Sequence, residues 1–185
     1  MTDAACTPDS CRLALPAEAE RIAAVQRRSW QQLFPADVAD HVLASVDLAT
    51  MAQSWVGAIT KPPLAKFRVL VAVEEGRVVG FAAVGPSDDA DAHPGTDAMV
   101  GEFIIDPPAQ RQGHGSRLLN AVVDLMRDAG FTHAYAWVPA EDAGTRGFLE
   151  AGGFAPDSAY RDRVVVEGDT DEQLLREIRL TAALA

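Results

Sequence analysis

The sequence predicts one α/β domain, a mixed sheet with helices on its faces. Strand and helix patterns alternate in the middle of the chain. Two β-rich runs meet at Glu75-Gly76, which is typical of a hairpin. Two more strand patterns follow one another near the C-terminus, taking in Arg163–Val166 and then residues 174–184. Together these observations favour a sheet that combines hairpins with strand–helix–strand connections.

Length and composition favour one domain with its own core. The chain has 185 residues, of which 48% are hydrophobic and 23% charged. We expect residues 1–10 to be a flexible N-terminus and residues 11–185 to be the domain. No run of 18 apolar residues and no signal-peptide pattern is found, so we expect a cytoplasmic protein with reduced thiols at Cys6 and Cys11. The four histidines lack metal-ligand spacing, so no metal site is predicted.

The net charge of the chain favours some classes of binding partner over others. The formal net charge is −11, which repels nucleic acid and anionic membranes. It favours a neutral or cationic small partner, although surface acid that keeps the protein soluble explains it equally well. We expect a monomer or homodimer.

The first half of the chain begins with a short strand candidate at 12–14. Apolar residues at near-helical spacing follow Pro16, with acid in the first turn, and Pro35 ends this helix. A second helical region is interrupted around Asp47 and runs to about Ile59. The hairpin comes next, then a polar, acidic loop at 85–97.

The second half is punctuated by proline and glycine. A strand over residues 98–106 stops at Pro107 and Pro108. The helix that follows has its apolar stripe at 118, 119, 122, 123, 126 and 129, and Gly130 is its C′ residue. A strand at 131–138, a short helix at about 142–151 and the last two strands complete the chain.

A basic, glycine-rich corner precedes the long helix, with the sequence Gln-Arg-Gln-Gly-His-Gly-Ser at 110–116. It is not a P-loop, because no Lys-Ser/Thr follows, and it is not a dinucleotide fingerprint, because Leu118 stands where the third glycine is needed. Bare backbone N–H groups at Gly113 and Gly115, at a helix N-terminus and beside Arg111, predict an anion site. An ordinary strand-to-helix turn is the alternative.

The flanks of this corner favour the anion site. Gln110, Gly113 and Gly115 after the Asp106-Pro107 step, and Phe148, Glu150, Gly153 and Phe154 downstream, resemble the GNAT superfamily of acyl-CoA-dependent N-acetyltransferases. The resemblance covers about residues 11–182. It implies a GNAT-like, mostly antiparallel sheet with a splayed parallel pair, and acetyl-CoA as acyl donor.

The resemblance also implies where acetyl-CoA binds. The backbone of Phe103, Ile104 and Ile105 would pair with the pantetheine arm like an added strand. The pyrophosphate would lie against the glycine corner and downstream residues, namely Gln110, Arg111, Gln112, Gly113, His114, Gly115, Ser116, Asp142 and Phe148. Asp142 replaces the family's usual asparagine. The His114 side chain is expected to be partly exposed and to have no chemical role.

Glu102 is the predicted catalytic base. It is a carboxylate among apolar strand residues, and its spacing before the glycines resembles that of the family's catalytic glutamate. An outward-facing strand residue is the alternative. Leu149 stands at the position of the family's acidic tyrosine, so Tyr135 is the candidate acid, with Tyr160 or departure of the thiolate into water as alternatives.

The acceptor is expected to be a small-molecule or protein amine. Trp30, Phe34 and Trp55 belong to the helical region that covers the acceptor site in GNAT proteins, although a helix-core role competes, most strongly for Trp30. Asp88, Asp89 and Asp91 could attract a cationic amine or simply be solvated. The predicted function is acetyl transfer from acetyl-CoA to an amine by direct attack on the thioester. A non-catalytic acyl-CoA-binding or regulatory domain remains open because of Leu149, and an α/β interaction domain without CoA affinity is a third alternative.

Overall fold

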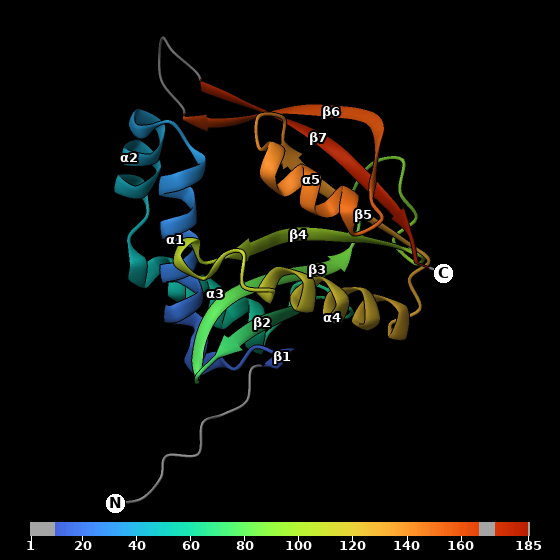
Figure 1. Ribbon diagram of the computed structural model, residues 1–185, viewed down its shortest axis with the longest axis horizontal. Coiled ribbons are helices and arrows are strands. Elements are labelled where there is room, and N and C mark those ends of the chain that lie inside the picture. The colour runs from blue at the N-terminus through green and yellow to red at the C-terminus, as the bar shows by residue number, and fades with distance from the viewer. Residues whose placement is uncertain (1–9, 167–172, 185) are drawn as a thin grey trace, which may run out of the picture.

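The computed structural model describes residues 10–166 and 173–184, and within them one seven-stranded sheet has the order β1-β2-β3-β4-β5-β7-β6 (Figure 1). In this part of the chain β4 and β5 are parallel, and every other neighbouring pair is antiparallel. This confirms the mixed, mostly antiparallel sheet with one parallel pair. The strands are β1 (Ser10–Leu13), β2 (Arg68–Glu74), β3 (Arg77–Pro86), β4 (Asp97–Ile105), β5 (His133–Pro139), β6 (Ala155–Val166) and β7 (Gln173–Ala183).

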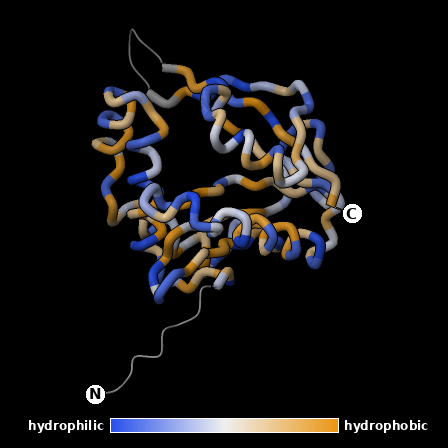
Figure 2. The backbone as a smooth tube through the Cα atoms, in the orientation of Figure 1, coloured by the Kyte–Doolittle hydropathy of each residue, from blue (hydrophilic) through white to orange (hydrophobic). Residues whose placement is uncertain are grey.

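Helices cover both faces of the sheet, as predicted. The helices are α1 (Ala19–Leu33), α2 (Ala36–Ser45), α3 (Leu48–Thr60), α4 (His114–Asp128) and α5 (Ala143–Ala151). On one face Ile22 and Val25 of α1, with Trp55 of α3, pack on Val71 and Phe81. On the other face α4 and α5 form a larger core with the strands, which includes Leu118, Val122, Leu149, Val100 and Ala134. Figure 2 shows hydrophobic residues along the central strands and alternating hydrophobic and polar residues along α4.

The turn residues lie where the sequence predicts them. Glu75 and Gly76 both have positive φ, 47° and 75°, as the tight β2–β3 hairpin requires. The Asp47 side chain accepts a hydrogen bond from Thr50 N and begins α3, which explains the break between α2 and α3. Gly130 has a φ of 82° just beyond α4, the left-handed conformation that ends helices.

Strands β4 and β5 separate partway along their length. Their register runs from Asp97↔His133 to Val100↔Ala136 and ends there. Beyond this point β4 continues to Ile105 beside β3, while β5 continues to Pro139 beside β7. Among the described strands, none therefore pairs with the side of β4 that faces away from β3, from Gly101 to Ile105.

A β-bulge at Gly101 turns Glu102 toward α1. The register passes from Val84↔Val100 to Ala83↔Glu102 and leaves Gly101 unpaired. Val100 and Phe103 consequently point into the α4 core, whereas Ile104 points into the α1–α3 core. Without the bulge, strict alternation would put Glu102 on the same face as Val100.

Two expectations concern the ends of the chain and membranes. Residues 1–9 of the expected flexible N-terminus, Cys6 included, lie outside the described residues, whereas residues 10–13 form β1 and Cys11 is a free thiol. Among the described helices none is individually long and apolar enough to cross a membrane; α2 and α3 reach that criterion only as a pair, with a 72° bend between them.

Candidate active site

The glycine corner presents unpaired backbone donors. Arg111 and Gly113 both have left-handed φ, 63° and 85°, and they turn the chain into α4. Arg117 N donates to Gly113 O at 3.2 Å, but the N–H groups of residues 114–116 have no carbonyl partner within the described residues. A Cβ built at Gly113 would meet no heavy atom within 4 Å. The start of α4 is thus open to an anion, with donors and helix dipole directed at it.

Side chains from α1 and from the loop itself fix this corner. Arg28 of α1 holds Asp106 with two hydrogen bonds, Nε to Oδ1 at 2.8 Å and Nη2 to Oδ2 at 2.6 Å. Gln110 Nε2 donates to Ile105 O at 3.2 Å, and Gln112 Nε2 donates to Pro108 O at 3.1 Å. The side chains of these two predicted cofactor residues therefore shape the loop.

His114 differs from the sequence expectation, because its side chain is buried and paired. It is 2% exposed, its Nε2 lies 3.2 Å from Glu74 Oε1, and Arg117 Nη2 lies 2.7 Å from its Nδ1. Arginine can only donate, so Nδ1 is the acceptor and Nε2 carries the proton toward Glu74. His114 ties the start of α4 to β2, a contact 40 residues distant that local patterns do not reveal.

Gly115 is predicted to let a phosphate approach, and its missing side chain also makes room for a neighbouring ring. A Cβ at Gly115 would lie 3.3 Å from Phe148 Cζ and 3.7 Å from Ile105 Cγ1. The Phe148 ring stacks on Phe103, with 5.5 Å between the ring centroids. Gly115 therefore makes room for this aromatic pair beside the opening between β4 and β5.

Glu102 ends a hydrogen-bond chain from two helices. Trp55 Nε1 of α3 donates to Gln26 Oε1 of α1 at 2.9 Å, and Gln26 Nε2 lies 3.5 Å from Glu102 Oε1. Burial raises the pKa of Glu102 to about 7; Arg163 and Gln26 act against the shift, and Glu177 adds to it. A carboxyl group of that pKa can accept a proton near neutral pH.

Charged residues of β6 and β7 lie on the same face as Glu102. Arg161 Nε donates to Glu177 Oε2 at 2.6 Å, and Arg163 Nη2 lies 3.2 Å from Glu177 Oε1. Glu177 itself is buried. The sequence analysis did not single out these residues, whose one local signal is the alternation Arg-Asp-Arg along β6.

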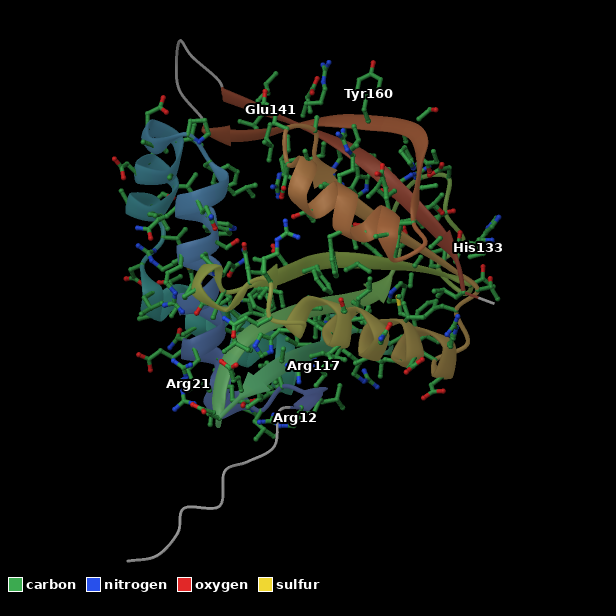
Figure 3. The ribbon with its side chains drawn as sticks, viewed as in Figure 1. Arg12, Arg21, Arg117, His133, Glu141 and Tyr160 are labelled. Carbon is green, nitrogen blue, oxygen red and sulfur yellow. The ribbon has the colours of Figure 1, made fainter. Side chains whose placement is uncertain are left out.

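Tyr135 lies one residue before β5 leaves β4, opposite Met99. Its neighbours Ala134 and Ala136 point into the α4 core, so Tyr135 points to the Glu102 face. The Arg179 guanidinium lies 4.8 Å from its ring centroid, and burial, with a smaller contribution from Asp97, raises the pKa of the phenol. Tyr160, the alternative acid, is 66% exposed and points outward (Figure 3).

The acidic loop is bound to Arg179 of β7. The guanidinium contacts Asp91 at 2.6 Å, Asp157 at 2.7 Å and Asp89 at 3.1 Å. Its hydrogen bond lowers the pKa of Asp91 to about 2. Asp89 and Asp91 are thus paired with an internal arginine and are not simply solvated, and because one guanidinium meets three carboxylates the cluster keeps a net negative charge.

The three aromatic residues expected at the acceptor site do not gather in one place. Trp30 and Phe34 have ring centroids 6.4 Å apart and pack with α2 and Leu175. Trp55 contacts the Phe81 ring edge-on at 5.0 Å and serves Gln26 through its indole. Phe34 therefore has the helix-core role that was the alternative. Trp55 is connected to the Glu102 carboxylate only through Gln26.

The downstream motif forms α5. Asp142 Oδ1 accepts a hydrogen bond from Thr145 N at 2.9 Å and caps this helix. Leu149 is fully buried in the α4 core. The position where the family has tyrosine is therefore an apolar core position in this chain.

The fold and site define a class of α/β protein in which a helix begins with free N–H groups beside two diverging strands. Comparisons with known proteins agree. The sequence model of the acetyltransferase (GNAT) family matches residues 27–154. The chain belongs to this family, which uses acetyl-CoA.

Individual relatives are similar to different extents. An uncharacterized N-acetyltransferase of Mycobacterium tuberculosis is 24% identical over 162 residues, covering 87% of this chain and 98% of that protein. The mycothiol acetyltransferase of Kineococcus radiotolerans is 32% identical to this chain over 96 residues. The match covers 48% of this chain and 30% of that relative, so the chain spans less than a third of the relative's length. A Salmonella typhimurium protein described as an acetyltransferase, solved with its cofactor acetyl-CoA, has the same fold, with a TM-score of 0.71 and 20% identity over 97% of this chain and 95% of that one.

Proposed function

We propose that this chain is an N-acetyltransferase that moves the acetyl group of acetyl-CoA to an amine by direct attack on the thioester, with Glu102 as the base. The observation that carries the proposal is the position of Glu102. The bulge at Gly101 turns this carboxyl group to the α1 face where β4 leaves β5, and Gln26 donates to it. The side chain is partly buried, and partial desolvation of a carboxylate is already costly, which supports a chemical role.

The residues present fit the donor. Acetyl-CoA supplies an acetyl group activated as a thioester. The N–H groups at the start of α4 are suited to its pyrophosphate, and the unpaired side of β4 at Phe103–Ile105 is suited to its pantetheine amides. Arg111 is exposed at the same corner and adds positive charge.

Glu102 accepts the proton that the attacking amine must lose, directly or through a water molecule. With a pKa of about 7, roughly half of the Glu102 side chains are carboxylate at neutral pH, which suits a base. The proton for the departing sulfur comes from Tyr135 or from water. Tyr135→Phe keeps the ring against Arg179 and removes the hydroxyl; a fall in kcat with KM unchanged supports the acid role, and an unchanged kcat assigns the proton to water.

The direct test is thiol release from acetyl-CoA in the presence of an amine panel. The wild-type protein is expected to release CoA only when an acceptor is present. Glu102→Gln keeps the size and the hydrogen bond but removes the basicity, and it is expected to lower kcat by about 10²–10⁴-fold with CoA affinity unchanged. Glu20→Gln, at an exposed position of α1, is the matched control. CoA binding with no thiol release for any amine would instead support a non-catalytic acyl-CoA-binding domain.

A further inference from the structure

Arg161 and Arg163 of β6 are held in place by one buried carboxylate. The Glu177 side chain is 5% exposed and bonds both guanidinium groups, at 2.6 Å and 3.2 Å. Arg161 also lies over the Trp137 ring, 4.4 Å from its centroid. Both arginine side chains remain about half exposed, 43% and 51%. They are therefore oriented by the protein and still accessible to a ligand.

The sheet register directs this pair toward the Glu102 face. Glu177 is opposite Arg161 on one side and Pro139, the last residue of β5, on the other. Arg163 is opposite Leu175, whose side chain packs against the α1–α2 corner at Phe34. Arg161, Arg163 and Glu177 therefore line the α1 face beyond the point where β4 and β5 part.

The group formed by Arg161, Arg163 and Glu177 is positive, on a face that also carries Glu102 and the aspartates bound by Arg179. Two guanidinium groups share a single carboxylate at Glu177, which leaves one positive charge in excess. Arg163 interacts electrostatically with Glu102 across the opening, which places both groups around a common space. Arginine binds carboxylates through two parallel N–H donors, and a guanidinium already oriented by a buried partner loses little freedom on binding.

We propose that the acceptor is an amine that also carries a carboxylate, bound by Arg161 and Arg163 while its amino group faces Glu102. The proposal rests on the proposed acetyltransferase function and names its substrate class. Such an acceptor is a zwitterion that is neutral overall, so it agrees with the neutral or cationic acceptor that the net charge of −11 favours. Trp30, which is partly exposed at the neighbouring α1–α2 corner, offers an apolar wall for the body of such a substrate.

The experiment compares amines that differ only in the carboxylate. Alanine, β-alanine, 4-aminobutyrate, glutamate and methionine are each assayed beside their carboxamides, together with aminomethylphosphonate and a peptide with a free N-terminal alanine. The readouts are thiol release from acetyl-CoA and calorimetric binding to the CoA-saturated protein. We expect at least one amino carboxylate to be strongly preferred over its carboxamide.

Single arginine variants test the assignment. Arg163→Gln and Arg161→Gln each leave Glu177 with one arginine partner, which protects the fold. Each is expected to lower kcat/KM for the carboxylate about 10- to 100-fold and to change that for the carboxamide little, as expected for one hydrogen bond to a charged group. Arg176→Gln is the control, because Arg176 is on β7 but pairs with Asp162, on the face away from Glu177.

The outcomes separate the two proposals. Equal or better use of the carboxamides or the peptide, or a carboxylate preference unchanged in both Arg161→Gln and Arg163→Gln, overturns the carboxylate assignment and leaves the acetyltransferase function intact. A preference for aminomethylphosphonate alone reassigns the pair to phosphonates and also overturns it. If no amine causes thiol release, the proposed acetyltransferase function fails. Binding of an amino carboxylate that depends on Arg161 and Arg163 would then still support a carboxylate site at these arginines. If no amino carboxylate binds, that site is rejected as well.

Discussion

The indole Nε1 of Trp55 donates to Gln26 Oε1 at 2.9 Å, which decides the orientation of the Gln26 amide. Because indole is only a donor, the amide oxygen must face Trp55, and the NH₂ group is left for Glu102. Gln26 is 6% exposed, so its amide has little alternative to these partners. Two helices far apart in sequence thereby set the environment of one carboxyl group.

Gln26→Leu is expected to move the acidic limb of the pH–rate profile to higher pH. The amide donates to the charged form of Glu102 and so lowers its pKa; its removal leaves Arg163 alone to oppose the upward effect of burial. The measurement is kcat/KM against pH for the wild type and the variant. Gln31→Leu, at an exposed position of the same helix, is the control, and Gln26→Leu added to Glu102→Gln should shift nothing. A limb that stays in place in Gln26→Leu would separate Gln26 from the titrating group.

Glu102→Gln is expected to stabilise the protein above pH 7. The folded pKa of Glu102 is about 7, above its ordinary value of 4.5, so between these values the native state holds a proton that the unfolded chain has lost. The free energy of unfolding contributed by this group therefore falls as pH rises from 4.5 to 7, and the deficit persists above 7. At pH 8 the variant should gain about 1–3 kcal/mol, a range reduced for partial solvation.

Urea unfolding at pH 5 and pH 8 measures this effect. The gain should be small at pH 5 and full at pH 8, whereas Glu20→Gln should show no such difference between the two. An equal gain at both pH values would mean that the effect is one of packing and not of titration. A positive result would link the stability deficit to the same carboxyl group that the reaction uses.

Local sequence patterns were sufficient to predict the helices, strands and turns, because hydrophobic periodicity and the positions of glycine and proline act over a few residues. The Glu75-Gly76 turn, the Asp47 break and the Gly130 helix end are of this kind. The mostly antiparallel sheet and its splayed parallel pair came from the family resemblance, and the order of the strands came only from the structure. The side-chain network could not be predicted, because its pairs are remote in sequence: Gln26 and Glu102 are 76 residues apart, and Arg179 and Asp91 are 88 apart.

Glu102 shows why even a correct residue choice needed the structure. Strict alternation from Val100 would bury it in the α4 core, and the bulge at Gly101 reverses that. A glycine within an otherwise apolar strand was the available signal. Burial of His114 was missed for a related reason, since a histidine at a helix start is usually solvated unless a distant acid, here Glu74, meets it.

The two glycines of the corner are expected to respond differently to alanine. Gly113→Ala puts a side chain at a φ of 85°, which costs about 1–2 kcal/mol although the space is open. Gly115→Ala meets Phe148 at 3.3 Å, and this close contact opposes the better helix propensity of alanine, so the net change should be small. Urea unfolding measures both. A larger loss for Gly115→Ala than for Gly113→Ala would contradict this assignment.

Gly115→Val should displace Phe148 and lower CoA affinity through that ring. The reason is steric, because a second branch at this position has no room beside the Phe103–Phe148 stack. Phe148→Leu added to Gly115→Val should restore part of the stability. Calorimetry with CoA on the folded variants gives the affinity; no rescue by Phe148→Leu would show that the valine acts directly at the phosphate site.

Arg179→Met is expected to release the loop between β3 and β4. The guanidinium binds Asp89, Asp91 and Asp157 and is 8% exposed, so its removal leaves three carboxylates close together without their cation. Limited proteolysis should cut residues 87–96 faster in this variant than in Arg176→Gln, which removes an exposed pair on the same strand. Equal cleavage rates would mean that backbone contacts alone hold the loop.

His114→Ala is expected to weaken both the fold and CoA binding. The imidazole is 2% exposed and joins Glu74 of β2 to Arg117 of α4, so truncation removes two hydrogen bonds and leaves a cavity, at a cost of about 2–4 kcal/mol. The first turn of α4, whose free N–H groups form the proposed anion site, loses its anchor to the sheet, and the affinity of the protein for CoA should fall.

Glu74→Gln is the conservative comparison, because its amide oxygen can still accept a hydrogen bond from His114 Nε2, whereas Glu74→Leu cannot. Urea unfolding and CoA calorimetry should therefore rank the proteins as wild type, Glu74→Gln, Glu74→Leu and His114→Ala, from strongest to weakest. Wild-type stability and CoA affinity in His114→Ala would show that the glycine corner holds its shape without this anchor.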